Sequence, residues 1–230
     1  MSFIIGAIVA SFSYVVGVRL PQHKNWWSAR SQCPCCHATL RWYELVPIIS
    51  FVWQLGRCRH CQSRISWRYV VVELCGGVVS VAFYSLYGMS LQWGMALFIM
   101  LFCFIVSVAD MTYMIVPNRV LLYVGVPLLL LYSLQQSIYS MIAGAVVAFG
   151  LLYTIHLLTD GIGAGDVKLV AVLGAFVQIE QLFFMLSIAC MFGFCLFVVR
   201  RERIIPFAPA LCMATLVTLF VDDLQLFTFY

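Results

Sequence analysis

Long apolar runs separated by short polar segments are the main pattern of this chain. A membrane-spanning helix needs about 20 consecutive apolar residues, and several of the runs approach that length. The runs lie at about residues 3–18, 69–89, 92–109, 119–134, 137–158, 167–177, 181–199 and 204–221. The pattern predicts an all-α fold, a polytopic membrane helical bundle of about eight spans.

The sixth run, 167–177, leaves one alternative open because it is short. It could join the seventh run across Gln178 and Glu180, which would give seven spans. Lys and Arg accumulate in cytoplasmic loops, so the basic residues can decide between the two topologies. With eight spans and the N-terminus outside, the basic residues near 110–119, 159–168 and 200–203 all fall inside. We therefore expect eight spans with both termini outside.

The composition agrees with a membrane class, since 64% of the residues are hydrophobic and only 10% are charged. Soluble proteins have about a quarter charged residues. Residues 3–18 are followed, not preceded, by a basic residue, so we expect a retained first span rather than a cleaved signal peptide. The basic residues of the predicted cytoplasmic loops explain the net charge of +4. We therefore expect contact with membrane lipid and not with nucleic acid.

A polar insert, residues 21–68, follows the first run and carries many basic residues, which predicts a cytoplasmic loop. The segments 33–36 and 58–61 each contain a C-x-x-C pair. Two such turns can complete a tetrahedral four-thiolate zinc site, and a closed site of this kind is structural. The expected ligands are Cys33, Cys36, Cys58 and Cys61.

Alternatives to this ligand set remain open. Cys35 could replace Cys36, and His37 or His60 could replace a thiolate. A disulfide pair is less favoured because cytoplasmic thiols stay reduced, and metal-free thiols are the other reading. The remaining five cysteines lie in apolar runs, where we expect small buried hydrophobic side chains. They are Cys75, Cys103, Cys190, Cys195 and Cys212.

Two isolated acids, Asp110 and Asp166, stand at the ends of apolar runs on the predicted cytoplasmic side. Two carboxylates that share a site cannot both ionise cheaply, so one keeps its proton and the pair can activate a water. Gly163 and Gly165 offer unusual backbone angles and space for a substrate strand. The simpler readings are that Asp166 caps the run at 167–177, that Asp110 is solvated, and that Asp160 pairs with Lys168.

The order of these motifs resembles the type IV prepilin peptidases, membrane aspartic proteases of the G-x-G-D class. Residues 11–12 and 19–21 resemble the family's opening, although Ala10 and Tyr14 replace its usual Gly and Asn. Segments 33–36, 56–61 and 65–73 resemble its zinc loop and the segment after it, with Val70 in place of Pro. The two family motifs D-x6-P-[DN] and G-x-G-D-x-K match residues 110–118 and 163–168.

The resemblance implies a reaction and a place. Such an enzyme lies in the bacterial cytoplasmic membrane and removes the basic leader of type IV prepilins or pseudopilins at the cytoplasmic face. Many members then N-methylate the new terminus with S-adenosylmethionine. The resemblance makes Asp110 and Asp166 catalytic, places Gly163, Gly165 and Lys168 in the active-site loop, and associates Gly56 with methylation.

These assignments divide the chain into a first span at 1–20, a zinc-binding loop at 21–68 and a seven-span catalytic domain at 69–230. The short length of the chain suggests an enzyme that processes the pseudopilins of a competence system. A rival hypothesis is a zinc-stabilised transporter or scaffold in which the acids line an ion path. It would place the acids near the middle of spans. The sequence indicates neither an oligomeric state nor a role for Asp160.

Overall fold

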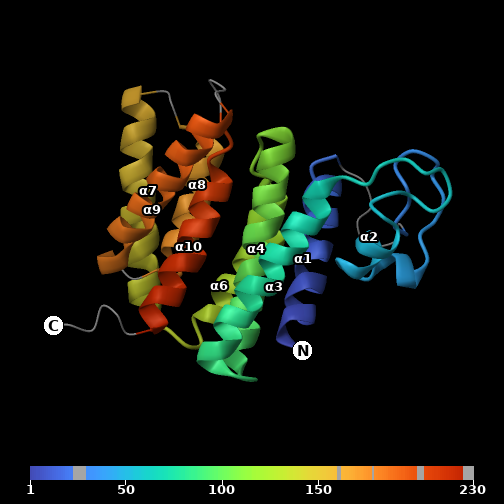
Figure 1. The fold of residues 1–230 in the computed structure, drawn as a ribbon. Coiled ribbons are helices and arrows are strands. Elements are labelled where there is room, and N and C mark those ends of the chain that lie inside the picture. The colour runs from blue at the N-terminus through green and yellow to red at the C-terminus, as the bar shows by residue number, and fades with distance from the viewer. Residues whose placement is uncertain (23–29, 160–161, 178, 201–204, 225–230) are drawn as a thin grey trace. The chain divides into compact units, whose positions relative to one another are not determined.

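The computed structural model describes residues 1–22, 30–159, 162–177, 179–200 and 205–224 (Figure 1). In these residues the fold is helical, and the only β-type pairing is two isolated bridges. The elements are α1 (Ser2–Arg19), η1 (Trp42–Leu45), α2 (Ile49–Trp53), α3 (Trp67–Tyr87), α4 (Leu91–Tyr113), α5 (Asn118–Val120), η2 (Leu121–Gly125), α6 (Val126–Tyr132), α7 (Ile138–Thr159), α8 (Ala164–Gly174), α9 (Ile179–Arg200) and α10 (Ala208–Asp223).

Every predicted apolar run is helical, which confirms the all-α fold of a multi-pass membrane protein. Five helices, α1, α3, α4, α7 and α9, are long and apolar enough to cross a membrane. The runs that form α5 to α6, α8 and α10 are shorter than expected. The 11 residues of α8, at 1.5 Å each, rise only about 16 Å, half of a hydrocarbon core.

The alternative in which the sixth and seventh runs fuse is wrong. Helix α8 ends at Gly174, and the Phe176 N–H donates to the Leu173 carbonyl in a turn at 175–177. The Tyr132 hydroxyl donates to the Phe176 carbonyl at 3.1 Å, so α6 holds this turn through a tertiary hydrogen bond. Apolar periodicity carries no information about such a contact.

The chain forms two compact units, residues 1–101 and 102–230, and α4 contributes to both. In the first unit, α1 packs closely against α3 through small residues. Ala10 is fully buried against Gly76, and a Cβ on Gly77 would lie 2.5 Å from the Phe3 ring. Small residues let membrane helices approach closely. Alanine at position 10 therefore preserves the small side chain that this contact needs.

The second unit contains a short buried helix between longer ones. Helix α8 packs against α7, α10 and η2, and Leu169, Val170 and Leu173 are fully buried. A Cβ on Gly174 would lie 2.6 Å from the Ala148 Cβ, so α7 and α8 are in close contact. Helix α10 packs against both α8 and α9. This packing fixes the position of the first turn of α8, where Asp166 lies.

The run at 119–134 is one interrupted helix. Residues 121–125 form a π-helical turn, η2, just before Pro127 near the start of α6. Proline has no N–H and cannot donate to the preceding turn. A π-helical turn is one way in which a helix accommodates such a break. The interruption lies directly after α5. This short helix begins at Asn118, the last residue of the first acidic motif, 110–118.

Candidate active site and metal centre

Asp110 lies in the last turn of α4 and is buried, with 6% of its surface exposed. The backbone N–H of Ala208 donates to its Oδ2 at 3.1 Å. Ala208 is the first residue of α10, so this N–H is one of the groups left without a helical partner at a helix N-terminus. The positive end of the α10 dipole also points toward this carboxylate.

Asp166 lies in the first turn of α8, the third helical residue after the N-cap Gly163. The N-cap position is therefore held by Gly163 and not by Asp166, while an acid in the first turn still interacts favourably with the helix dipole. Its N–H donates to the Gly163 carbonyl at 3.0 Å. A Cβ on Gly163 would lie 3.3 Å from Asp166 Oδ2. Glycine at 163 therefore leaves room for the carboxylate.

The two acidic motifs, residues 110–118 and 163–168, are in direct contact. A Cβ on Gly165 would lie 3.1 Å from the Val116 Cβ, so the second motif packs on the first at this glycine. The Lys168 Nζ donates to Asn118 Oδ1 at 3.4 Å. These contacts join G-x-G-D-x-K to D-x6-P-N. The structure thus brings together Asp110, Asp166, Gly163, Gly165 and Lys168.

The glycines serve a different purpose from the one expected. Gly163 has φ −66°, and neither it nor Gly165 is among the described residues with positive φ. A Cβ on Gly163 would face Asp166 of the same motif, and a Cβ on Gly165 would face Val116 of the other motif. Close contacts, and not an unusual backbone angle, therefore favour glycine at both positions.

The electrostatic environment distinguishes Asp166 from an ordinary aspartate. Asp166 precedes the apolar run at 167–177 and lies outside the five long apolar helices. Burial, followed by the nearby negative charge of Asp110, raises the pKa of Asp166 to about 6. The two carboxyls are therefore close enough to influence each other's ionisation, as two acids in one site do. Such a pair can hold one proton and one charge near pH 6.

The sequence reasoning missed two groups that position this site. One is the Ala208 N–H, which no sequence signal could reveal because every non-proline residue has such a donor. The other is His156 in the last turn of α7, whose Nδ1–H donates to the Ile162 carbonyl at 2.6 Å. A lone imidazole in the apolar run 137–158 was a usable signal. Asp160, with its suggested Lys168 pairing, lies outside the described residues.

Four cysteines converge in the polar insert of the first unit. The Sγ atoms of Cys33, Cys36, Cys58 and Cys61 all lie within 4.8 Å of one another. The Cys33 and Cys61 sulfurs are 3.8 Å apart, and a tetrahedron with Zn–S bonds of 2.3 Å has edges of about 3.8 Å. All ten cysteines are free, so no disulfide is present. The set has the geometry to hold a metal ion.

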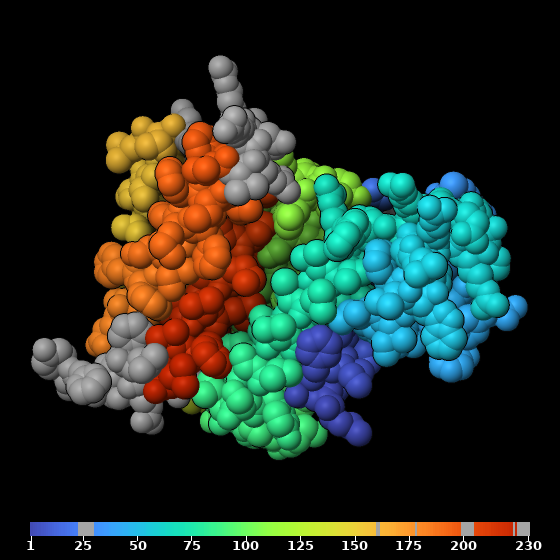
Figure 2. Space-filling view, in the orientation of Figure 1, coloured from blue at the N-terminus to red at the C-terminus, as the bar shows by residue number. Residues whose placement is uncertain are grey.

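Two equivalent turns deliver these cysteines, although the sequence shows no evident repeat. The Cys33 N–H donates to the Ala38 carbonyl, and the His37 N–H donates back to Cys33. The same pair of bonds links Cys58 with Ser63 and Gln62. Each turn is closed by an antiparallel bridge, at 32–39 and at 57–64. The insert is therefore built from two copies of one cysteine-bearing turn. Most of its surface is light blue to cyan in Figure 2.

Gly56 leads into the second turn and has a structural reason to be glycine. Its φ is +68°, and a Cβ would lie 2.9 Å from the Phe51 ring. Its N–H donates to the Phe51 carbonyl and its carbonyl accepts from the Ile65 N–H. A side chain at this position would therefore be strained and would press on Phe51.

The insert is tied to α3 by Glu73, which is buried in that helix. Its Oε2 accepts from the Ile48 N–H at 2.8 Å. Ile48 itself has a positive φ of 64°, an uncommon value for a branched residue. The buried carboxylate thus holds a strained turn just before α2 against the membrane helix.

The expectation for the other cysteines is only partly correct. Cys103 and Cys212 are buried, whereas Cys75, Cys190 and Cys195 are exposed on the surfaces of α3 and α9. An apolar side chain on a spanning helix can face lipid, so an apolar run does not imply burial inside the protein.

Comparison with known proteins gives matches over most of the chain. Residues 4–87 match the bacterial peptidase A24 N-terminal domain, and residues 97–198 match the type IV leader peptidase family. The prepilin leader peptidase/N-methyltransferase of Bacillus subtilis (strain 168) is 35% identical over 239 residues, which cover 99% of this chain and 96% of that protein. No solved structure matches the chain.

Proteins with the same name in more distant bacteria are also similar. That of Burkholderia pseudomallei (strain K96243) is 34% identical, covering 87% of this chain and 70% of the relative. That of Vibrio cholerae is 28% identical, covering 94% of each. Since the similarity extends over the cysteine insert and both acidic motifs, the chain belongs to the bacterial peptidase A24 family of type IV leader peptidases.

Proposed function

We propose that this chain is a prepilin leader peptidase and N-methyltransferase of the bacterial inner membrane, with an aspartic endopeptidase site. The observation that carries the proposal is the contact between the two acidic motifs. This contact supports an electrostatically coupled pair of Asp110 and Asp166. Both acids lie in end turns of helices, not at mid-helix, which disfavours the rival ion path.

The two carboxyls have different environments, which assigns their roles in hydrolysis. Asp110 accepts the Ala208 N–H at the start of α10 and holds the negative charge. Asp166 holds the proton, because burial and the Asp110 charge raise its pKa to about 6. Asp110 then takes a proton from the attacking water, and Asp166 protonates the carbonyl oxygen or the leaving amine. No covalent intermediate with the enzyme is needed.

The substrate would approach this pair from the membrane surface. In the proposed eight-span topology, both termini are outside and both acidic motifs lie at the cytoplasmic ends of their helices. The apolar helix of a prepilin or pseudopilin would lie in the membrane, with its basic leader in the cytoplasm. The scissile bond then reaches the boundary where Asp110 and Asp166 meet. Three shorter helices fit this arrangement if the surrounding longer helices shield them from lipid.

A zinc ion fits the four-thiolate group of Cys33, Cys36, Cys58 and Cys61, and would be structural. When bound, it supplies a cross-link between the two cysteine turns and a charge that keeps the thiols ionised. The chain's own contribution includes Ser63, whose hydrogen bond to the Cys61 thiol lowers the pKa of that thiol to about 6. A lower pKa favours the thiolate that metals bind.

Methyl transfer from S-adenosylmethionine is assigned to the same polypeptide, on the strength of its similarity to relatives that carry both names. Gly56 belongs to this part of the proposal as a residue of the insert. Its positive φ and its contact with Phe51 support a positioning role for the loop rather than contact with the methyl donor.

The test is prepilin processing in membranes, read by the mass of the substrate's N-terminus. We expect the wild-type chain to remove the leader and add a methyl group, and Asp110→Asn and Asp166→Asn to leave the leader in place. Glu180→Gln is the matched control, because Glu180 is an exposed acid in the first turn of α9. Full cleavage by either aspartate variant would contradict the mechanism.

A further inference from the structure

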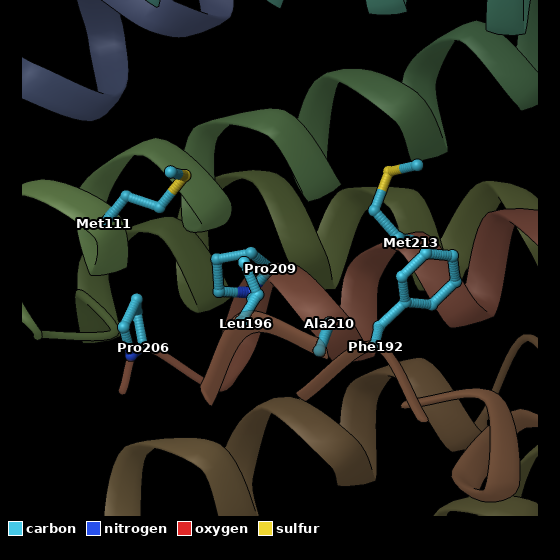
Figure 3. A pocket seen from close by; sticks show the side chains of 7 residues that line it. All are labelled: Met111, Phe192, Leu196, Pro206, Pro209, Ala210 and Met213. Atoms are coloured by element: carbon cyan, nitrogen blue, oxygen red, sulfur yellow. The ribbon is translucent and has the colours of Figure 1, made fainter. Parts of the chain in front are cut away.

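An apolar pocket of about 180 Å³ lies among α4, α9 and α10 of the second unit (Figure 3). Its lining includes Met111, Phe192, Leu196, Pro206, Pro209 and Met213. None of the lining side chains is polar. A charged or polar group placed here would lose its hydration without gaining a side-chain partner, so the pocket suits an apolar group.

One end of this pocket is formed by residues that are close in sequence to Asp110 and to its backbone donor. Met111 directly follows Asp110 in α4, and Pro206 and Pro209 flank Ala208, whose N–H holds the Asp110 carboxylate. Residues that line the pocket therefore lie next in sequence to Asp110 at the end of α4, and close in sequence to its donor at the start of α10. The proline rings fix φ and give this end a stiff wall.

The pocket extends along α10, away from the start of that helix. Met213 lies five residues beyond Ala208 in α10, which corresponds to about 7.5 Å along the helix. In Figure 3, Met213 and Phe192 lie together at one end of the group, and Met111 and Pro206 lie at the other. The pocket thus runs from the level of Asp110 along two apolar helices.

We propose that this pocket binds the large apolar side chain of the substrate on the membrane side of the scissile bond, and so determines specificity. This inference rests on the proposed peptidase function. The leader side of the bond is basic and does not suit the lining, whereas the membrane side belongs to an apolar helix. An apolar cavity of about 150 Å³ binds benzene, so 180 Å³ accommodates an aromatic ring or a branched aliphatic chain.

The test combines enzyme variants with a substrate series that carries Ala, Val, Leu, Phe or Trp directly after the scissile bond. Leu196→Phe narrows the pocket, and Phe192→Ala widens it. For Leu196→Phe, we expect kcat/KM with the Phe substrate to fall about tenfold, while the Ala substrate is cut within about twofold of wild type. For Phe192→Ala, we expect a Trp substrate to gain relative to the Ala substrate.

The matched control is Phe194→Ala, since Phe194 lies on the same helix, is 67% exposed and is absent from the pocket lining. We expect it to leave the substrate preference unchanged. Equal loss for every substrate in both pocket variants would overturn the inference. The same assay in proteoliposomes with lipids of different acyl-chain length gives a second check. A loss of cleavage that changes with the length of the lipid acyl chains, and not with the substrate side chain, would also overturn the inference, because the pocket would then bind lipid.

A failure of the proposed peptidase function can be distinguished from a failure of the pocket assignment. If the wild-type chain leaves all substrates uncut, as Asp166→Asn should, then the peptidase proposal itself fails. If wild type cuts every substrate at the same rate, the peptidase stands and the pocket assignment fails. Retained cleavage of the Ala substrate by Leu196→Phe confirms that the variant is folded, and Phe192→Ala tests the pocket in the opposite direction.

Discussion

The cysteine insert and the aspartate site differ in how their residues are brought together. In the insert, each C-x-x-C pair lies within a turn of a few residues, and two turns with the same hydrogen bonds meet. In the aspartate site, Asp110 and Asp166 come from α4 and α8, and a third element, α10, supplies a backbone donor. One site depends on local turns whose four cysteines could hold a metal ion. The other depends on helix packing.

This comparison predicts that the two sites can be disabled separately. Asp110→Asn and Asp166→Asn should each lower leader cleavage by about 100-fold or more, because general acid and base contributions reach that size. Neither change touches the cysteine turns, so zinc content per chain should equal that of wild type. Cleavage rate and metal content measured on the same membranes test the separation. Loss of zinc in either variant would contradict it.

The converse change should remove the metal. Cys58→Ser takes away one of the four convergent sulfurs, and we expect zinc to be lost and the insert to become sensitive to protease. Cys35→Ser is the matched control, because Cys35 lies beside Cys36 but outside the convergent group. Elemental analysis and limited proteolysis provide the two readouts. If Cys35→Ser also loses zinc, the ligand set must be revised.

The packing between the acidic motifs can be perturbed with less damage. A methyl group at Gly165 would lie 3.1 Å from the Val116 Cβ, so Gly165→Ala should push the motifs apart. We expect cleavage to fall about tenfold, since small displacements in a catalytic site are costly. Adding Val116→Ala should restore part of the activity. An uncompensated double variant would show that the glycine acts in some other way.

The proton on the carboxyl pair should give both activity and stability a pH dependence. Folded Asp166 has a pKa of about 6, against 3.8 for an ordinary aspartate. The folded protein therefore keeps a proton that the unfolded chain releases in this range. This stabilising contribution is complete below about 3.8 and is lost as the pH rises through about 6.

The measurements are kcat/KM and thermal stability in detergent across that range. Since the pair works with one proton, kcat/KM should fall as the pH rises through about 6. The stability of wild type relative to Asp166→Asn should fall over the same interval. A difference in stability that is constant with pH would mean that Asp166 does not hold the extra proton.

The smallest expected effect belongs to His156, which holds the start of the second motif through the Ile162 carbonyl. A single hydrogen bond contributes about 1 kcal/mol, so His156→Leu should lower kcat severalfold. His156→Gln retains a donor and should recover part of the loss. Unchanged kcat in His156→Leu would show that the loop is held by its other contacts alone.

Much of this protein could be read from the sequence because the signals are local. Apolar runs fixed the helical class, and the C-x-x-C spacing identified the four cysteines that converge. The acidic motifs identified which aspartates to examine. Each of these signals lies within one continuous segment, where composition and spacing have direct structural meaning.

Only the tertiary structure showed how these segments meet. It separated α8 from α9, showed that Gly165 packs on Val116, and supplied the Ala208 donor to Asp110. It also revealed the repeated cysteine turn and the apolar pocket among α4, α9 and α10. These features depend on backbone groups and on contacts between residues far apart in the chain. A backbone N–H has no sequence signature, and helix packing decides which of them reaches a buried carboxylate.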